Sequence, residues 1–452
     1  MTAIAIIAGL IALVWGAAIF LRGGLVAGCL TVLLAGICFG YPFFHLSTEP
    51  IPLTADRVLW VVLMGQYVVW RRWGLAQPKP MGAADWTLAA FLAALAASTF
   101  LFDWHSGGAK PLARLLFYYL MPIGLYWVAR QAAVSERAVL GIFACLAAFG
   151  LYVAATAVAE VHQAWWAVYP KYIADASNLA FFGRGRGPLL NPVGTGVLAG
   201  AGLVALLLWW PRANAWGRLL LAATAMLLFA GIYATYTRTA WMGAGLGVAV
   251  LAALTLPRSW RALLLGGGLT IAVLLAATQW ESILAFKRDR GHAASEAADS
   301  VELRPILATV AWHMFLDRPW LGCGLAGYDQ ASKDYFSDRS TELPLEKARP
   351  YTQHSVFLSL LAETGILGAG SFVILLGLWA RDAWRLWRAT TAPLWARQQG
   401  LLLLAVLAVY LPNGVFHDVS IIPMVNMGLF FLAGVTAGLR PWASSLDVRG
   451  SP

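Results

Sequence analysis

Charged residues are scarce in this sequence. They make up 12% of its 452 residues, whereas hydrophobic residues make up 60%. A soluble domain carries about 25% charged residues, so this composition excludes a soluble globular protein. Cysteine is rare as well: the four cysteines form no C-x-x-C pair and no Cys/His spacing of a metal site. Neither a disulfide framework nor a structural zinc site is therefore expected.

Two kinds of binding motif are also missing. The sequence has no D-x-D pair of acidic metal ligands and no phosphate-binding P-loop, which predicts a metal-independent reaction without a cofactor. The net charge of +10 comes from Lys and Arg residues spread among loops, so we expect no nucleic-acid partner. Membrane lipids explain the positive charge better, because Lys and Arg concentrate at cytoplasmic loops and anionic headgroups.

Long apolar runs recur along the whole chain, with the length of about 18 to 22 residues that crosses a bilayer. They are continuously apolar rather than alternating, which excludes a transmembrane β-barrel. We therefore predict an all-α polytopic membrane protein with about twelve or thirteen transmembrane helices. The predicted spans are 2–21, 24–44, 56–70, 85–102, 112–129, 138–160, 190–210, 219–236, 239–256, 262–279, 354–380, 399–415 and 419–439. The first is interpreted as a retained span, because it lacks the basic start and cleavage site of a signal peptide.

The short loops differ in their positive charge, which predicts the orientation. Every second loop is basic, and this set comprises Arg22, Arg71, Arg72, Lys79, Arg130, Arg137, Arg212, Arg218, Arg258, Arg261, Arg381, Arg385, Arg388, Arg397 and Arg440. By the positive-inside rule these loops are cytoplasmic. The longer segments 161–189 and 280–353 then face the periplasm of a Gram-negative cell. All seven histidines (His45, His105, His162, His292, His313, His354 and His417) lie on or near that face, so we predict an inner-membrane protein whose chemistry is periplasmic.

These features divide the chain into three parts. Residues 1–279 form a membrane domain of about ten spans, residues 280–353 a polar periplasmic loop, and residues 354–452 the last spans and a cytoplasmic tail. The loop is too polar to enter lipid and too long for a bare connection. Its stretch VELRPILATVAWHMFLDRPWLG has helical spacing that ends at Pro319 and Gly322. We therefore expect a small helical cap held against the membrane face.

Arg238 lies in the stretch YATYTRTAWMGAG, between two apolar runs that leave almost no room for a loop. A charge facing lipid at the bilayer centre costs at least about 2.5–3.5 kcal/mol. Two interpretations are open: a snorkelling residue that ends one helix, or an anion-binding residue at the external mouth of the protein. The neighbouring hydroxyl groups, among them Tyr236 and Thr237, favour the second, because a plain turn seldom needs so many hydroxyls.

Four more arginines are candidate substrate ligands. Arg184 and Arg186 stand in the motif GRGRG, where two guanidinium groups beside flexible backbone suit a diphosphate held by bidentate hydrogen bonds. Arg304 opens the expected helix of the cap, and Arg349 lies near the end of the polar loop. Ordinary interpretations remain open: Arg184 and Arg186 as anchors on lipid phosphates, and Arg304 as a solvated helix charge.

His354 stands where the polar loop gives way to the apolar stretch HSVFLSLLAETGILG. The helix dipole disfavours the charged form of a histidine at a helix N-terminus, so we expect a neutral imidazole that can accept a proton. An enzyme that acts on a headgroup at the membrane surface would place its general base at such a point. The alternative is a capping or interfacial histidine without a chemical role.

Three motifs, in order along the second half of the chain, resemble the O-antigen ligase and polymerase superfamily. They are TRTAW at 237–241, WHMFLDRPWLGCGL at 312–325 and, starting at His354, the pattern H-S-x9-G-x-x-G that ends at Gly368. The first departs mildly from the family pattern, since Thr237 stands where serine is common and keeps the hydroxyl. The N-terminal half is similar to the superfamily only in being multi-spanning.

The resemblance implies a polytopic glycosyltransferase of the GT-C type that uses no nucleotide sugar and no metal. Its donor would be a glycan on undecaprenyl diphosphate, presented at the periplasmic face. Arg238 and Arg304 would hold the diphosphate, and His354 would take a proton from the acceptor hydroxyl, with inversion at the sugar. Arg184, Arg186, Arg349, Tyr236 and Thr237 remain candidate substrate-binding residues.

We predict the ligase of this superfamily, which attaches O-antigen to lipid A–core in lipopolysaccharide biosynthesis. The first alternative is a repeat-unit polymerase, whose acceptor is a second lipid-linked glycan, and the next is transfer to a protein hydroxyl. A non-enzymatic lipid transporter is the alternative from another class. It would need charged residues deep within several spans and paired halves, and the sequence has neither in obvious form.

Overall fold

A computed structural model of the chain describes residues 22–41, 43, 45, 52–76, 78–102, 111–175, 181–271, 273, 274, 277, 278, 294–349 and 351–440, with the side chains of 294–302 left aside. The predicted span 2–21 lies outside these residues, as do His105, His292 and, in the predicted span 262–279, residues 272, 275, 276 and 279.

The prediction of an all-α polytopic membrane protein is confirmed. Within the described residues the secondary structure is helical without strands, and eight helical segments are long and apolar enough to cross a membrane. They are α3 (Ala83–Phe100), Pro111–Gln131, α6 (Glu136–Val161), Pro192–Arg212, α8 (Ala215–Ala234), α9 (Arg238–Thr255), α14 (Val356–Arg388) and α15 (Leu394–Phe416). The total of twelve or thirteen spans stays a prediction, because three of them lie wholly or partly outside the described residues.

Several shorter helices complete the membrane part. Two of them are apolar, Arg22–Cys38 and α16 (Pro423–Gly438), and α2 (Ala55–Arg72) is more polar. The segment Pro111–Gln131 consists of α4 (Pro111–Arg114), the π-helical turn η1 (Leu115–Leu120) and α5 (Met121–Gln131). The segment Pro192–Arg212 contains α7 (Pro192–Leu207) and a final 3₁₀ turn.

Polar side chains fix where important helices begin. Asn191 accepts hydrogen bonds from the backbone N–H groups of Val193 (2.9 Å) and Gly194 (3.1 Å), with Pro192 in the first turn of α7. Ser355 accepts a hydrogen bond at the start of α14 in the same way. Such caps satisfy backbone donors that have no partner inside the helix. The start of α14 therefore sets the position of His354, the residue before Ser355.

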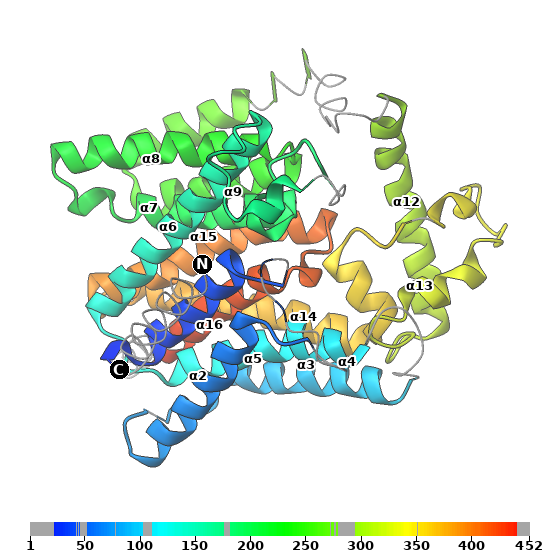
Figure 1. Cartoon of the computed structure of the whole chain (residues 1–452), viewed down its shortest axis with the longest axis horizontal. Coiled ribbons are helices and arrows are strands. Elements are labelled where there is room, and N and C mark those ends of the chain that lie inside the picture. The colour runs from blue at the N-terminus through cyan, green and yellow to red at the C-terminus, as the bar shows by residue number, and fades with distance from the viewer. Residues whose placement is uncertain are drawn as a thin grey trace, which may run out of the picture.

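The helices form two groups joined by a central pair. Helices α6, α7, α8 and α9 lie in one group and α2, α3, α5 and α16 in the other, with α14 and α15 between them (Figure 1). Helix α15 packs against α7 and α9, and α14 packs against α3 and α15. Structural elements distant in sequence therefore meet around α14 and α15.

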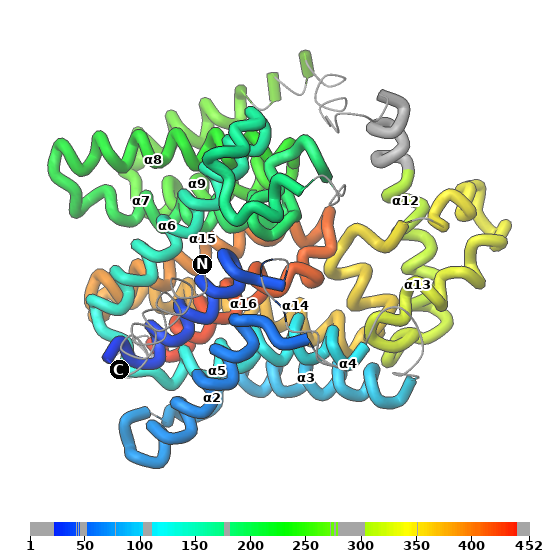
Figure 2. Tube along the Cα trace, in the orientation of Figure 1, coloured from blue at the N-terminus to red at the C-terminus, as the bar shows by residue number. Residues whose placement is uncertain are grey.

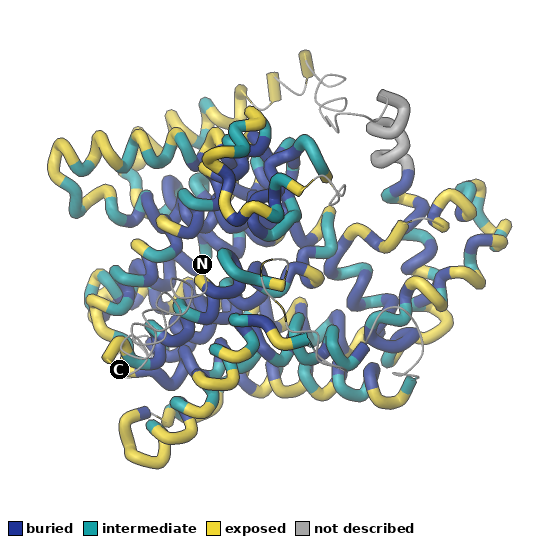
Figure 3. The backbone as a smooth tube through the Cα atoms, viewed as in Figure 1, coloured by how far each residue is buried: buried dark blue, intermediate teal, exposed yellow. Residues whose placement is uncertain are grey.

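Burial differs strongly between helices of the first group. Helix α7 is buried along nearly its whole length, whereas α8 is exposed on most of its surface (Figure 3). Small residues let the helices approach closely, as is common in membrane proteins. A Cβ atom added at Gly202 of α7 would lie 2.8 Å from the Cα of Gly150 in α6. One added at Gly231 of α8 would lie 2.3 Å from the Cβ of Ala154.

Residues 294–349 form a helical unit at one end of the molecule, seen most easily in the trace of Figure 2. It contains α12 (Ala294–Asp317), α13 (Tyr328–Ala331) and the 3₁₀ turns η6 (Ser332–Tyr335) and η7 (Leu345–Ala348). Its apolar side chains form a cluster that comprises Ile306, Leu307, Val310, Ala311, Met314, Cys323, Tyr328, Phe336, Leu345, Ala348 and, from α14, Ala362. The unit thus shares its small core with α14.

Candidate active site

A cavity of about 340 Å³ lies where the two helix groups, α12 and the start of α14 meet. Its lining residues are Phe181, Arg184, Asn191, Val193, Tyr236, Thr237, Arg238, Thr239, Arg304, Thr352, Gln353, His354, His417, Asp418, Ile421 and Ile422. Six of the eight residues predicted from the sequence are among them. The structure therefore brings three predicted guanidinium groups and the predicted imidazole to one cavity.

The motif TRTAW explains how Arg238 reaches the cavity. Tyr236 has a left-handed backbone (φ 48°), so the chain turns sharply after α8, and Arg238 is the first residue of α9. The indole of Trp241 donates a hydrogen bond to the carbonyl of Ile232 (2.9 Å), which closes the end of α8. Ala240 packs closely on α7: a Cβ atom added at Gly196 would lie 2.4 Å from the Cβ atom of Ala240. The motif therefore joins two helices with a short turn and presents one arginine.

Arg184 lies beneath this turn and is almost fully buried. Its guanidinium donates hydrogen bonds to the carbonyls of Thr235 (3.1 Å) and Tyr236 (3.3 Å) and to the hydroxyl of Thr237 (2.7 Å). Carbonyl groups at a sharp turn have few partners in the backbone, and the guanidinium fork supplies them. Arg184 lines the cavity and also fixes the turn that carries Arg238.

Arg186 lies outside the cavity, in contrast to its predicted role as a phosphate ligand. It is fully buried and forms an ion pair with Glu160 of α6 (Nε to Oε1, 2.7 Å). The backbone N–H groups of Arg186 and Gly187 donate to the other oxygen of Glu160 (2.7 and 3.1 Å), and the guanidinium donates to the carbonyl of Ile173 (2.8 Å). A buried carboxylate is stable only with such partners, so the second arginine of GRGRG serves the loop itself.

Arg349, the other predicted residue that does not line the cavity, lies directly after η7. Its side chain is exposed there, and the residues that line the cavity do not include it. It stands close to His354 in the sequence, but of the described residues between them only Thr352 and Gln353 line the cavity.

Arg238 and Arg304 reach the cavity from two different helices, α9 and α12. Arg304 comes from α12 and stacks over the ring of Phe416 (5.1 Å to the centroid). Its pKa is lowered, first because burial disfavours the charged guanidinium and then because Arg238 repels it. Two neighbouring positive charges raise the free energy of the empty site, and an anionic ligand between them would lower it.

His354 lines the cavity and is exposed. It directly precedes Ser355, the N-cap of α14, so the predicted position at a helix start is what the structure has. His417, at the end of α15, supplies a second imidazole to the lining. The sequence predicts His417 on the external face but indicates no role for it.

Two buried polar atoms of the lining have no hydrogen-bond partner among the described residues. They are the side-chain oxygen Oε1 of Gln353 and the hydroxyl of Thr239. Both residues are more than nine-tenths buried. Buried polar groups without a partner cost free energy, and a ligand with hydroxyl groups would satisfy both.

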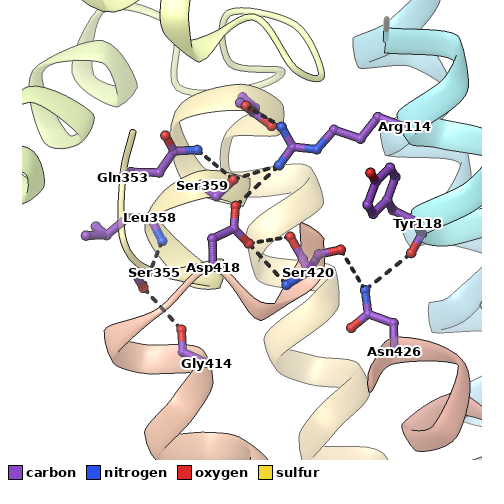
Figure 4. A network of polar contacts seen from close by, with 11 residues as sticks. Arg114, Tyr118, Gln353, Ser355, Leu358, Ser359, Gly414, Asp418, Ser420 and Asn426 are labelled. Carbon is purple, nitrogen blue, oxygen red and sulfur yellow. Dashed lines mark hydrogen bonds and ion pairs between the residues drawn. The ribbon is translucent and has the colours of Figure 1, made fainter. Parts of the chain in front are cut away.

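An ion network lies directly beneath the cavity (Figure 4). Arg114 of α4 contacts Glu363 of α14 (3.0 Å) and Asp418 (3.4 Å), and donates a hydrogen bond to Ser359 (3.1 Å). The amide of Gln353 donates to the same hydroxyl of Ser359 (2.8 Å). Asp418 also accepts hydrogen bonds from the backbone N–H and the hydroxyl of Ser420. The network therefore fixes two cavity-lining residues, Gln353 and Asp418, relative to α4 and α14.

A break in α14 explains the motif PWLGCGL. Gly365 has φ 61° and ψ −163°, a conformation that only glycine adopts readily. The loop after α12 fills this break: the carbonyl of Pro319 accepts from Ile366 (2.8 Å), and the N–H of Cys323 donates to Ala362 (2.9 Å). A Cβ atom at Gly322 would lie 2.4 Å from the backbone of Glu363. Gly322 and Gly365 therefore allow the close backbone contacts that hold the 294–349 unit against α14.

A comparison with known protein families bears directly on this site. Residues 223–373 match the O-antigen ligase family. The resemblance seen in the three motifs is thus confirmed over about a third of the chain, from within α8 to within α14. A search of curated proteins found no match. The matched part contains Arg238, Arg304 and His354, whereas Arg184, Arg114 and Asp418 lie outside it.

Arg238, Arg304 and His354 lie in the matched region and were found from the sequence, whereas Arg114, Glu363, Asp418 and Gln353 were missed. Arg114 and Asp418 lie far from Glu363 and Gln353 in the sequence, and tertiary packing brings the four together. One signal was present: Glu363 is an acid inside a predicted span, where a charge needs a partner. Its partner could not be named, because Arg114 is 249 positions away.

Proposed function

We propose that the protein transfers a glycan from undecaprenyl diphosphate to a sugar hydroxyl at the periplasmic face of the inner membrane. As an O-antigen ligase, it would use lipid A–core as its acceptor. The observation that carries this proposal is the meeting of Arg238, Arg304 and His354 in one cavity, within a region that matches the O-antigen ligase family. The partnerless oxygen atoms of Gln353 and Thr239 support a hydroxyl-rich ligand in the same cavity.

The chemistry follows from these groups. The two guanidinium groups would bind the diphosphate and stabilise the negative charge that grows as the glycosidic bond breaks. The acceptor hydroxyl oxygen attacks the anomeric carbon, and its proton passes to His354 as general base. The bond from the anomeric carbon to the diphosphate oxygen breaks, and its electron pair leaves with undecaprenyl diphosphate. Attack opposite the leaving group inverts the anomeric centre.

An apolar cavity beside the site suits the lipid tail of the donor. It has a volume of about 620 Å³ and lies between α6, α8 and α9. Tyr236 lines both this cavity and the polar one, so the two are neighbours. The remaining lining includes Phe229, Ile232 and Trp241 and is almost wholly apolar. A prenyl chain in this cavity would place its diphosphate next to Tyr236 and Arg238.

The base assignment is tested by His354→Ala in a purified transfer assay. We expect turnover to fall by about 10²- to 10⁴-fold, with donor binding retained. His313→Ala is the matched control, because His313 lies in the neighbouring 294–349 unit, contacts Asp338 (2.9 Å) and does not line the cavity. Full activity of the His354 variant would refute the role of base, and rates that fall with a chelator would refute metal independence.

The choice between ligase and polymerase is tested in a deletion strain. Loss of a ligase leaves long lipid-linked chains that accumulate, whereas loss of a polymerase leaves single repeats attached to lipid A–core. We expect the long free chains. The absence of long free chains would contradict the ligase assignment. It would not contradict glycan transfer to another acceptor, which the purified transfer assay tests.

A further inference from the structure

A second polar cavity lies on the side of the site away from α9. It has a volume of about 470 Å³ and is bounded by α2, η1 and the connection before α16. Asn191, Ile421 and Ile422 line both this cavity and the candidate active site. Helices α2 and α9 lie on opposite sides of α16 in Figure 1. The active site therefore has a neighbouring cavity on each side.

The chemistry of this second cavity differs from that of the arginine-rich side. Its charged lining residues are one acid, Asp56, and one base, Arg57. Hydroxyl and amide groups surround them, from Thr54, Tyr118 and Asn191. The hydroxyl of Thr54, which is 1% exposed, has no hydrogen-bond partner among the described residues. A balanced acid–base pair with hydroxyls suits sugar hydroxyl groups better than it suits a diphosphate.

An apolar groove continues from this cavity along α2. The groove has a volume of about 370 Å³ and shares Arg57, Phe117 and Met121 with the polar cavity. Its other lining residues are apolar, among them Val58, Val61 and Val62, whose side chains are exposed on α2. The indole of Trp60 donates to the carbonyl of Met121 (3.0 Å), which holds α2 against the start of α5. The groove suits an aliphatic chain whose headgroup enters the polar cavity.

We propose that this cavity and groove bind the acceptor glycolipid, with its sugar beside Asp56 and Thr54 and its lipid chain along α2. The proposal rests on the proposed transferase function. Both substrates of such a reaction stay anchored in the membrane, so each needs its own lateral approach to one site. The donor diphosphate matches the arginine pair, and the acceptor sugar matches the balanced cavity. The acceptor would then meet the donor from the side opposite the leaving group, as inversion requires.

The test is the kinetics of Val62→Trp with lipid A–core as acceptor and an undecaprenyl-diphosphate oligosaccharide as donor. A bulky indole in the groove should raise the KM for lipid A–core about tenfold or more, with the donor KM within about twofold. Val69→Trp is the matched control, since it stands two turns along α2, is similarly exposed (42% against 49%) and lines neither cavity. Equal effects of the two variants, or a rise in donor KM alone, would overturn the proposal.

A second measurement does not depend on turnover. A photoreactive benzoylphenylalanine at position 62 should cross-link radiolabelled lipid A–core, and one at Phe229 should cross-link the undecaprenyl-diphosphate oligosaccharide. Cross-linking of the undecaprenyl probe at position 62, or no more lipid A–core at 62 than at 69, would overturn the proposal. If the wild-type protein transfers no glycan at all, the proposed function fails. If it transfers glycan but lipid A–core never labels position 62, only this inference fails.

Discussion

Two kinds of arginine occupy the interior of this protein, and they differ in their partners. Arg186 and Arg114 pair with the carboxylates of Glu160 and Glu363 at 2.7 and 3.0 Å. Arg304 faces Arg238 across the candidate site, where their charges repel. A buried arginine with a carboxylate partner holds the fold together, whereas under the proposed function the two arginines that repel each other bind an anion. We therefore propose that charge balance distinguishes structural arginines from substrate-binding ones, which the sequence alone does not distinguish.

The largest loss of stability is expected from Arg186→Met. This change leaves Glu160 buried without its partner, which costs about 3–5 kcal/mol, and we expect a large drop in the midpoint of thermal unfolding in detergent. The double variant Glu160→Gln with Arg186→Met serves as control, because removing both charges together should restore much of the stability. A single variant as stable as the wild type would show that the ion pair does not hold the GRGRG loop.

Arg304→Ala should have the opposite pattern, with a large effect on donor binding and a small one on stability. A hydrogen bond to a charged group contributes about 1.5–3 kcal/mol, so the donor Kd should rise about 10- to 150-fold. The substitution removes both the repulsion from Arg238 and the contact of Arg304 with the ring of Phe416, and these two effects on stability have opposite signs. Such a cation–π contact contributes about 1 kcal/mol, so the free energy of unfolding should change by no more than this amount. Titration of the purified variant with undecaprenyl diphosphate and a thermal unfolding scan check both parts. Unfolding of the variant with unchanged donor affinity would place Arg304 among the structural arginines.

A smaller effect is expected from Arg304→Lys. The charge remains, but the planar fork that binds two phosphate oxygens at once is lost. We expect a rise in donor Kd of about tenfold or less, between the wild type and the alanine variant, in the same titration. A lysine variant as weak as the alanine variant would mean that fork geometry rather than charge dominates the binding.

The smallest effect is expected from Trp241→Phe, which tests the turn rather than the charges. The phenyl ring keeps the stacking on Tyr233 (5.2 Å between centroids) but loses the hydrogen bond to Ile232. Such a bond contributes about 0.5–1.5 kcal/mol, so thermal unfolding should begin slightly earlier and donor affinity should change less than about threefold. A strong loss of donor binding would show that the closure of α8 positions Arg238 more tightly than we infer.

The membrane helices were predictable from local sequence, because each apolar run of sufficient length forms its own backbone hydrogen bonds in lipid. The predicted spans 85–102 and 138–160 correspond to α3 and α6. The break in α14 was not predicted. Gly365 lies in the middle of an apolar run, and its backbone partners come from the loop after α12, which no local pattern connects to it.

The candidate site was predictable to the extent that its residues carry local signals. Arg238 stands out because it interrupts two apolar runs, and His354 because it begins one. The same reasoning failed to distinguish Arg184 from Arg186, since both stand among glycines and only the fold brings Glu160 to one of them. The cavity along α2 had no sequence signal, because Asp56 and Arg57 look like an ordinary charged helix start.

A density map of the protein with bound undecaprenyl diphosphate would test the central claim most directly. We expect the diphosphate between the guanidinium groups of Arg238 and Arg304, with His354 at the sugar-facing end of the cavity and the prenyl chain along α8 and α9. A diphosphate bound elsewhere, out of reach of both arginines or at the cytoplasmic side of the membrane, would contradict it.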